Sequence, residues 1–333
     1  MKGITPIIAI VILLLITVAI AGAGYSYISM YTGGLMNRQV EITGATCTDG
    51  LAKIMIKNIG TDVIDTGDIK VMDSRTGADI TGNLQWSSGS AGSSKVLEYR
   101  LEEGAGTVAR DTSGGRKDGT LTNGPVWTTA GRIGGALNFN GVDQGITIGS
   151  LINISQMDFS MGAWFMPVSN YPNDHAVIGT WRGDWAKAWI CVNNNNIYLY
   201  ISNGSTSNNI VNCGTFVMNN WYHVVFVGDW TKRMTMCFVN GVNTANGTFP
   251  VNDVSNHWGV GQMRGWEYKF NGTIDEAAVW DRALSGAEVK EVYDNRANVT
   301  TGDISTFTHI CSESVCQYSI VFGGSVKGAY VNC

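Results

Sequence analysis

The sequence predicts a mainly β protein with one long hydrophobic N-terminal helix and two antiparallel β sandwiches, one of which interrupts the other. Glycine accounts for 42 of the 333 residues, which is typical of short strands joined by tight turns. Charged residues make up only 15% of the chain, below the roughly 25% of an average soluble domain. An uncharged apolar run of helical length extends from Ile4 to Ile28.

The charge balance argues against nucleic acid as a partner. The chain has 22 basic and 27 acidic side chains, a net charge of −5, whereas phosphate backbones bind basic surfaces. The 11 Trp, 12 Tyr and 10 Phe residues provide more apolar area than a disordered chain carries. The length fits two domains of roughly 150 residues each.

The apolar run from Ile4 to Ile28 is long enough to cross a membrane. Its 25 residues would reach roughly 37 Å as a helix, more than a bilayer core of about 30 Å. It satisfies the pattern of a secretory signal with a cleavage site at Ala19–Ala21. It equally fits a simple membrane anchor whose inside tail carries Lys2.

A third interpretation rests on a resemblance, because the run KGITPIIAIVILLLITVAIAG is similar to the N-termini of archaeal type IV pilins and archaellins. The resemblance implies a class III leader peptide, residues 1–3, that is cleaved between Gly3 and Ile4. It also implies that residues 4–34 form a helix that lies in the membrane before assembly and then packs against identical subunits in an extracellular filament. The glutamate that follows the cleavage site in bacterial type IV pilins is missing here.

A small β domain is expected on both sides of a large insertion. Residues 52–58 alternate between apolar and polar side chains, as in a half-buried strand. Near the C-terminus, Tyr318–Phe322 and Val326–Val331 are two strands separated by turn residues. We predict that residues 35–86 and 300–333 form one sandwich, which resembles the heads of archaeal pilins.

The insertion carries the most specific motifs of the chain. They include YRLEEGAGTVARDTSGGRKDGTLTNG, DFSMGAWFMP, WYHVVFVGD and FNGTIDEAAVWDRALSGAEVKEVY. These motifs resemble the laminin G-like jelly roll, a concanavalin A-like sandwich of two antiparallel sheets, across residues 96–297. A Gly/Ser-rich linker, residues 87–95, precedes it. Ser285 and Glu288 match a capping box that begins one short helix.

The sequence predicts a binding protein rather than an enzyme. The concanavalin A-like architecture also hosts glycoside hydrolases, but their E-x-D-x-x-E run is absent from the sequence. The histidines show no metal-ligand spacing; they are His175, His223, His257 and His309.

Tryptophan-rich stretches suggest a ligand-binding surface. GTWRGDWAKAW and HWGVGQMRGWEYKF are unusually rich in tryptophan for loops or strand edges, and exposed indole rings stack on sugars and form binding hot spots. We predict a site for glycans or cell-surface glycoproteins with four residues: Trp181, Trp185, Trp266 and Asp184. Packing of these rings in the core is the alternative.

A structural calcium ion is the one cofactor that the sequence suggests. Asp111, in DTSGG, and Asp275, in GTIDE, lie beside turns that can supply backbone carbonyls, and calcium binds mixed oxygen ligands of this kind. Alternatively, Asp111 caps a turn and Asp275 pairs with an arginine such as Arg282.

Cysteines and sequons agree with an exported protein. The seven cysteines form no C-x-x-C pair, so disulfides are favoured over zinc. We predict the pairs Cys47–Cys333 and Cys311–Cys316, and the pairing of Cys191, Cys213 and Cys237 stays open. Five N-x-[ST] sequons are predicted glycosylation sites: Asn153, Asn203, Asn246, Asn271 and Asn298.

These inferences combine into a predicted function. The protein is expected to be the structural subunit of an archaeal type IV pilus-like filament at the cell surface, displaying the laminin G-like domain for adhesion. A membrane-anchored, lectin-like receptor that does not polymerise is the alternative, and a secreted polysaccharide hydrolase is the third possibility. Filaments on cells separate the first hypothesis from the second.

Overall fold

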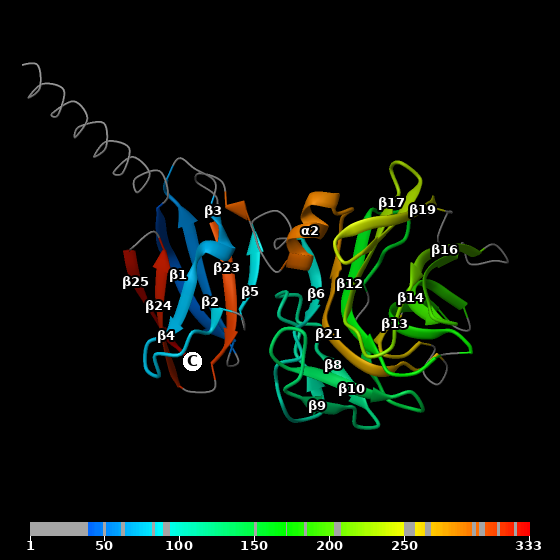
Figure 1. The fold of residues 1–333 in the computed structure, drawn as a ribbon, viewed down its shortest axis with the longest axis horizontal. Helices are drawn as coiled ribbons and strands as arrows, with labels where there is room; N and C mark the ends of the chain where they lie inside the picture. Colours follow the sequence, from blue (N-terminus) through cyan, green and yellow to red (C-terminus); the bar gives the residue numbers. More distant parts are fainter. Residues whose placement is uncertain are drawn as a thin grey trace, which may run out of the picture.

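The computed structural model contains two β sandwiches, each with its own hydrophobic core (Figure 1). The residues that the structure describes are 39–48, 51–60, 64–81, 84–88, 94–149, 152–170, 172–182, 185–202, 208–249, 257–263, 268–294, 298–299, 304–311, 314–322 and 325–333.

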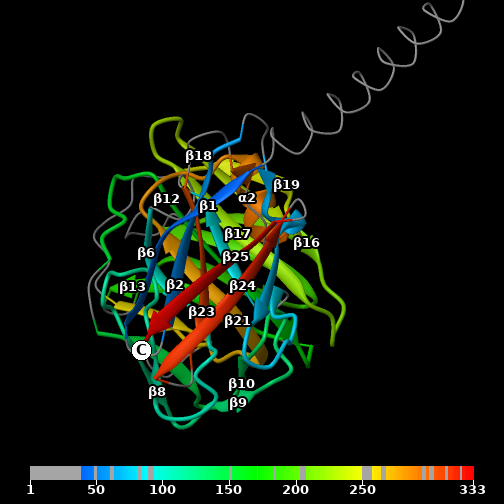
Figure 2. The same ribbon diagram turned by 90° about the vertical axis from the view of Figure 1, so that its left-hand side faces the viewer.

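The smaller sandwich is built from segments far apart in the sequence. One sheet has the order β1 (Val40–Thr48), β2 (Leu51–Asn58), β23 (Ile304–Ile310), β5 (Gln85–Ser88), and the other has the order β25 (Ser325–Asn332), β24 (Val315–Phe322), β4 (Lys70–Asp73). The strands β3 (Ile64–Asp65) and β22 (Asn298–Val299) form a further antiparallel pair, and the short 3-10 helix η1 (Thr66–Asp68) follows β3. Blue and red strands therefore lie side by side in Figures 1 and 2.

Alternating side chains close the core of the smaller sandwich. Ile54 and Ile56 of β2 are fully buried, and Phe307 of β23 lies opposite Ile54. In the other sheet, Val71 lies opposite Ile320, and both are buried. The two segments of the chain thus share one apolar core, because burial of these side chains removes apolar surface from both at once.

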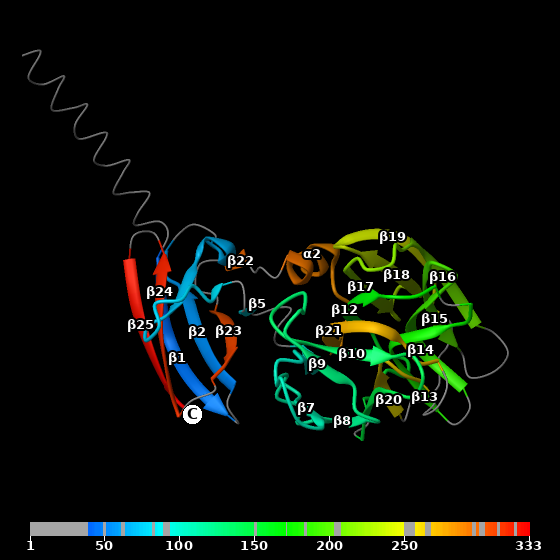
Figure 3. The same ribbon diagram turned by 60° about the horizontal axis from the view of Figure 1, so that its bottom comes forward.

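The larger sandwich consists of two eight-stranded antiparallel sheets (Figure 3). The first, here called the helix-side sheet, has the order β19 (Val242–Thr248), β18 (Met234–Val239), β17 (Tyr222–Asp229), β12 (Phe159–Pro167), β21 (Asn271–Trp280), β10 (Ala136–Asn140), β9 (Val126–Thr128), with β6 (Lys95–Tyr99) also paired to β21. The second, here called the open sheet, has the order β16 (Asn208–Thr215), β15 (Asn196–Ser202), β14 (Trp185–Asn193), β13 (His175–Arg182), β20 (His257–Val260), β11 (Gly145–Ile148), β8 (Gly119–Thr122), β7 (Val108–Ala109).

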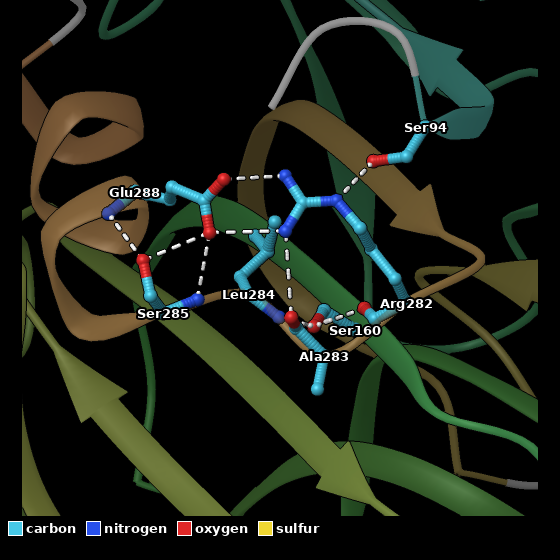
Figure 4. A network of polar contacts seen from close by, with 7 residues as sticks. All are labelled: Ser94, Ser160, Arg282, Ala283, Leu284, Ser285 and Glu288. Atoms are coloured by element: carbon cyan, nitrogen blue, oxygen red, sulfur yellow. Dashed lines mark hydrogen bonds and ion pairs between the residues drawn. The ribbon is translucent and has the colours of Figure 1, made fainter. Parts of the chain in front are cut away.

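One short helix, α2 (Gly286–Asp294), packs on the helix-side sheet. Val289 of the helix is fully buried with Trp280 and Phe238 of the sheet. The predicted capping box is confirmed (Figure 4): the backbone amide of Glu288 donates to Ser285 Oγ at 3.3 Å, and the amide of Ser285 donates to the Glu288 carboxylate at 2.8 Å.

Arg282 completes this network. Its guanidinium donates to both oxygens of Glu288, at 2.5 and 3.0 Å, and its Nε donates to Ser94 Oγ at 3.0 Å. The bonds from Arg282 and Ser285 lower the pKa of Glu288 to about 2. Arg282 thus pairs with Glu288 and not with Asp275, the pairing considered from the sequence.

We expect Glu288→Gln to lower the free energy of unfolding by about 1 kcal/mol at pH 6, after allowance for solvent screening of this partly exposed group. Because the folded pKa lies below the unfolded one, this contribution exists above about pH 4.3 and disappears as the pH falls towards 2. Urea unfolding of both proteins at pH 6 and pH 3 checks this, and an undiminished difference at pH 3 would contradict it.

The predicted fold class needs one correction. We expected a long hydrophobic helix, but the described residues form a mainly β fold whose single α-helix, α2, has nine residues. Within these described ranges, no helix combines the length and apolar character needed to span a bilayer. Period-two alternation and turn residues dominate the sequence of these ranges, as is typical of strands. The expected helix, residues 4–34, and the cleavage position at Gly3 and Ile4 lie outside the described residues.

Candidate functional site

The outer face of the open sheet carries a cluster of aromatic side chains. Alternation along β15 turns Ile197, Leu199 and Ile201 into the core, so Tyr198 and Tyr200 point to the opposite face. Trp189 of β14 is the register partner of Tyr200. We call the group formed by Trp189, Tyr198, Tyr200 and Tyr268 the platform.

The rings of the platform are in mutual contact. The centroid of Trp189 lies 5.1 Å from that of Tyr200 and 4.8 Å from that of Tyr268, the latter in an edge-to-face arrangement. Tyr198 and Tyr200 are 6.3 Å apart. Trp189 is only 4% exposed, whereas the three tyrosines are half-buried. The indole thus forms the base, and the tyrosine rings reach solvent.

A glycine makes room for the base of the platform. Gly179 of β13 is the register partner of Trp189. A Cβ added to Gly179 would lie 2.4 Å from the Cβ of Trp189 and 2.6 Å from the sulfur of Met263. A larger residue at this position would therefore displace the indole or the methionine.

Polar side chains border the platform at the start of β13. Asp174 Oδ1 accepts a hydrogen bond from Asn193 Nδ2 at 2.8 Å and a longer one from the Tyr200 hydroxyl at 3.4 Å. Burial and the nearby Cys191 and Asp174 raise the pKa of Tyr200. The Tyr200 hydroxyl therefore keeps its proton at neutral pH and acts as a donor.

Two titratable side chains, His175 and Cys191, lie next to the platform. Burial lowers the pKa of His175, whose Nδ1 contacts the backbone carbonyl of Lys269, so its ring is neutral at pH 7. Cys191, beneath the platform, is fully buried and has no disulfide partner, and burial raises the pKa of its thiol well above the usual value. Burial thus disfavours the charged forms of both groups, the imidazolium of His175 and the thiolate of Cys191.

The structure places only one of the predicted tryptophan-site side chains, that of Trp181, among the described residues. Trp181 is only 7% exposed and stacks on His257, with ring centroids 5.5 Å apart. The expectation that its ring lies at the surface is therefore wrong. Trp185 lies in β14, but its side chain, like Asp184 and Trp266, lies outside the described part of the chain.

The sequence prediction did not include the platform tyrosines, because it was based on the tryptophan-rich stretches. The signal was present in the run NIYLYIS of β15, where strict alternation places two tyrosines on one face and three aliphatic residues on the other. A solvent-facing sheet surface that carries aromatic rather than charged residues is typical of a binding surface.

The two candidate calcium ligands have different surroundings. Asp111 accepts hydrogen bonds from the backbone amides of Glu98, Ser113 and Lys117, at 3.0, 3.0 and 2.9 Å, so its carboxylate caps a turn. Among the described residues, no group of three or more His, Cys, Asp or Glu side chains could hold a metal ion. Calcium binding at Asp111 and Asp275 stays a prediction.

Asp275 retains one free oxygen. Its Oδ2 accepts from the amides of Arg132 and Ile133, each at 2.9 Å, while its buried Oδ1 has no partner in the described structure. Burial raises the pKa of Asp275 to about 8, and the nearby Glu102 adds to the shift. Glu102 likewise has one buried oxygen without a partner in the described residues.

Three disulfides are present. They join Cys47 to Cys333, Cys311 to Cys316, and Cys213 to Cys237. Of the three cysteines whose pairing the sequence left open, Cys191 remains as a buried free thiol. Of the predicted glycosylation sites, Asn153 and Asn246 are exposed and Asn271 is half-buried; Asn203 and the side chain of Asn298 lie outside the described structure.

Comparison with known proteins identifies the fold of the larger sandwich. Residues 140–290 match the model of the concanavalin A-like lectin/glucanases superfamily. No curated protein matches the chain. Among solved structures, the binding domain of Paraclostridial Mosquitocidal Protein 1 is similar, with a TM-score of 0.53 and 15% identity over 61% of this chain and 52% of that one.

Two further structures show the same fold. Domain 4 of AbnA, a GH43 extracellular arabinanase from Geobacillus stearothermophilus, in complex with arabinotriose, has a TM-score of 0.50 and 22% identity over 60% of this chain and 98% of that one. The botulinum neurotoxin serotype G binding domain has a TM-score of 0.50 and 16% identity over 60% and 50%. The alignment thus spans about half of the toxin domains. The larger sandwich is a concanavalin A-like jelly roll, and the predicted laminin G-like domain is confirmed.

Proposed function

We propose that the jelly roll binds carbohydrate on the platform and that the protein thereby attaches to glycans or glycoproteins outside the cell. The observation that carries this proposal is the arrangement of Tyr198, Tyr200 and Tyr268 around the buried Trp189, with Asp174 at the border. Aromatic faces stack on the apolar faces of sugar rings, and a carboxylate accepts hydrogen bonds from sugar hydroxyls.

The comparisons support a binding role. Domain 4 of AbnA has the same fold and is described as a complex with arabinotriose, and the toxin domains are described as binding domains. The disulfides support an extracellular location, because such bonds persist in oxidising compartments. The filament role implied by the N-terminal resemblance stays a prediction that depends on residues outside the described structure.

The platform tyrosines provide the test. A glycan array that includes arabinotriose first identifies the oligosaccharides that bind the full chain. We expect Tyr198→Ala and Tyr200→Ala each to weaken binding of the best oligosaccharide by about tenfold, equivalent to about 1.4 kcal/mol. Isothermal titration calorimetry measures the change.

Tyr330→Ala is the matched control, because Tyr330 is 71% exposed on β25 of the smaller sandwich. This variant should bind as the unmodified protein does. Near-ultraviolet circular dichroism verifies that each variant keeps its packed core. Glycan binding that survives both platform substitutions, or an array with no binding at all, would refute the proposal.

A further inference from the structure

We infer that the platform binds uncharged glycans more tightly than anionic ones, and that the carboxylate of Asp174 causes this preference. This inference rests on the proposed carbohydrate binding and adds the class of sugar. It starts from the hydrogen-bonding capacity at the border of the platform, where the carboxylate of Asp174 accepts hydrogen bonds from Asn193 and from Tyr200.

One carboxylate oxygen of Asp174 accepts hydrogen bonds from the protein, and the other is available to a ligand. Its Oδ1 accepts from Asn193 Nδ2 and from the Tyr200 hydroxyl. Within the described structure, Oδ2 has no hydrogen-bond partner, and the side chain is partly exposed. The carboxylate is thus fixed in position and still has an acceptor for a ligand.

Asn193 supplies a second acceptor next to the first. Its Oδ1 is buried and has no partner among the described residues. A buried polar atom without a partner is costly, and a ligand hydroxyl that reaches it would remove that cost. Two neighbouring acceptors require a ligand that brings donors, as the adjacent hydroxyls of a neutral sugar do.

The negative charge of Asp174 acts on the platform. Its carboxylate contributes to the raised pKa values of both Tyr200 and Cys191, which places these groups within its electrostatic reach. The neighbouring His175 is neutral at pH 7, since burial lowers its pKa. Lys269 is only 4% exposed, and its ammonium donates to Gln262 Oε1 at 2.5 Å. Because the Lys269 ammonium is buried against Gln262, Asp174 is, among these described neighbours, the charged group that reaches solvent beside the platform.

An anionic sugar would therefore face two penalties. Its carboxylate or sulfate group offers no proton to the acceptors of Asp174 and Asn193, and it is repelled by the charge of Asp174. Discrimination by an unpaired acceptor and a like charge is a common source of specificity.

The test compares neutral oligosaccharides with their uronic-acid and sulfated counterparts on one array, using the full chain. We expect the unmodified protein to prefer the neutral member of each bound pair by at least about tenfold. Asp174→Asn keeps the shape of the side chain and removes the charge. It should narrow the preference to within about threefold, mainly by strengthening binding of the anionic member.

Asp294→Asn is the matched control, because it removes the same charge from α2, where Asp294 pairs with Lys290. The control should keep the full preference. Equal or tighter binding of anionic sugars by the unmodified protein would overturn the inference and leave carbohydrate binding intact. A preference that persists in Asp174→Asn would overturn the role of Asp174. Absence of binding to every glycan would overturn the proposed function together with the inference.

Discussion

Replacing both Cys47 and Cys333 with serine should destabilise the smaller sandwich by up to about 5 kcal/mol in the chain-entropy model. The bond joins residues that are 286 positions apart and connects β1 with the end of β25. Without it, the two segments of this sandwich are held together by their shared core and strand pairing alone. The loss is large because the bond closes such a long loop.

Hydrogen exchange measured by mass spectrometry checks this prediction segment by segment. Amides of β1, β2 and β23 should exchange roughly a thousandfold faster in the double variant, whereas those of β12 and β17 in the jelly roll should be unchanged. Replacing Cys311 and Cys316, which are five positions apart, is the control and should cost only about 2 kcal/mol. Unchanged exchange in β1 and β23 would show that the bond contributes little.

The second large effect concerns a buried histidine. His223 of β17 is 2% exposed, lies against Trp164 and Tyr293 with ring centroids 5.1 and 6.0 Å away, and its Nδ1 has no partner in the described structure. Burial lowers its pKa to about 3. Because the unfolded pKa is about 6.5, this residue costs no stability at pH 7 and about 3 kcal/mol at pH 4.

His223→Phe removes the titration and keeps an aromatic ring in the same packing. Its stability should lie within about 1 kcal/mol of the unmodified protein at pH 7, and it should be the more stable of the two by about 3 kcal/mol at pH 4. Urea unfolding at both pH values measures this change. If the free energies of unfolding of the variant and the unmodified protein differ by the same amount at pH 7 and at pH 4, His223 does not titrate as described.

The jelly roll was predicted from motifs that resemble the laminin G-like domain, with which the alternation and turn residues agree, and the start of α2 was predicted from a local capping box. Alternation and turn residues depend on near neighbours, and the capping box of Ser285 and Glu288 lies within four residues. The tyrosines of β15 follow from the same alternation and could have been predicted in the same way. This much of the candidate site was therefore accessible from the sequence.

The position of Trp181 could not be predicted from its own strand. The register between β13 and β14 shifts between Thr180 and Trp181, as in a β-bulge. The indole lies close to Gly259 of β20, where a Cβ would approach it to 3.1 Å. Gly259 is far away in the sequence, so the burial of Trp181 is decided by pairing between distant strands. Asp174 and Tyr200 likewise meet only through the folded sheet.

The jelly roll is inserted between β5 and β22, so the chain enters and leaves it from the same small sandwich. A tension applied to a bound ligand would be divided between two covalent connections instead of one. Both connections end in paired strands, since β5 pairs with β23 and β22 pairs with β3. The Cys47–Cys333 bond closes this sandwich across its two segments, so separating them under load would require breaking a covalent bond. Two covalent connections therefore join the jelly roll to a smaller sandwich whose two segments are cross-linked by a disulfide.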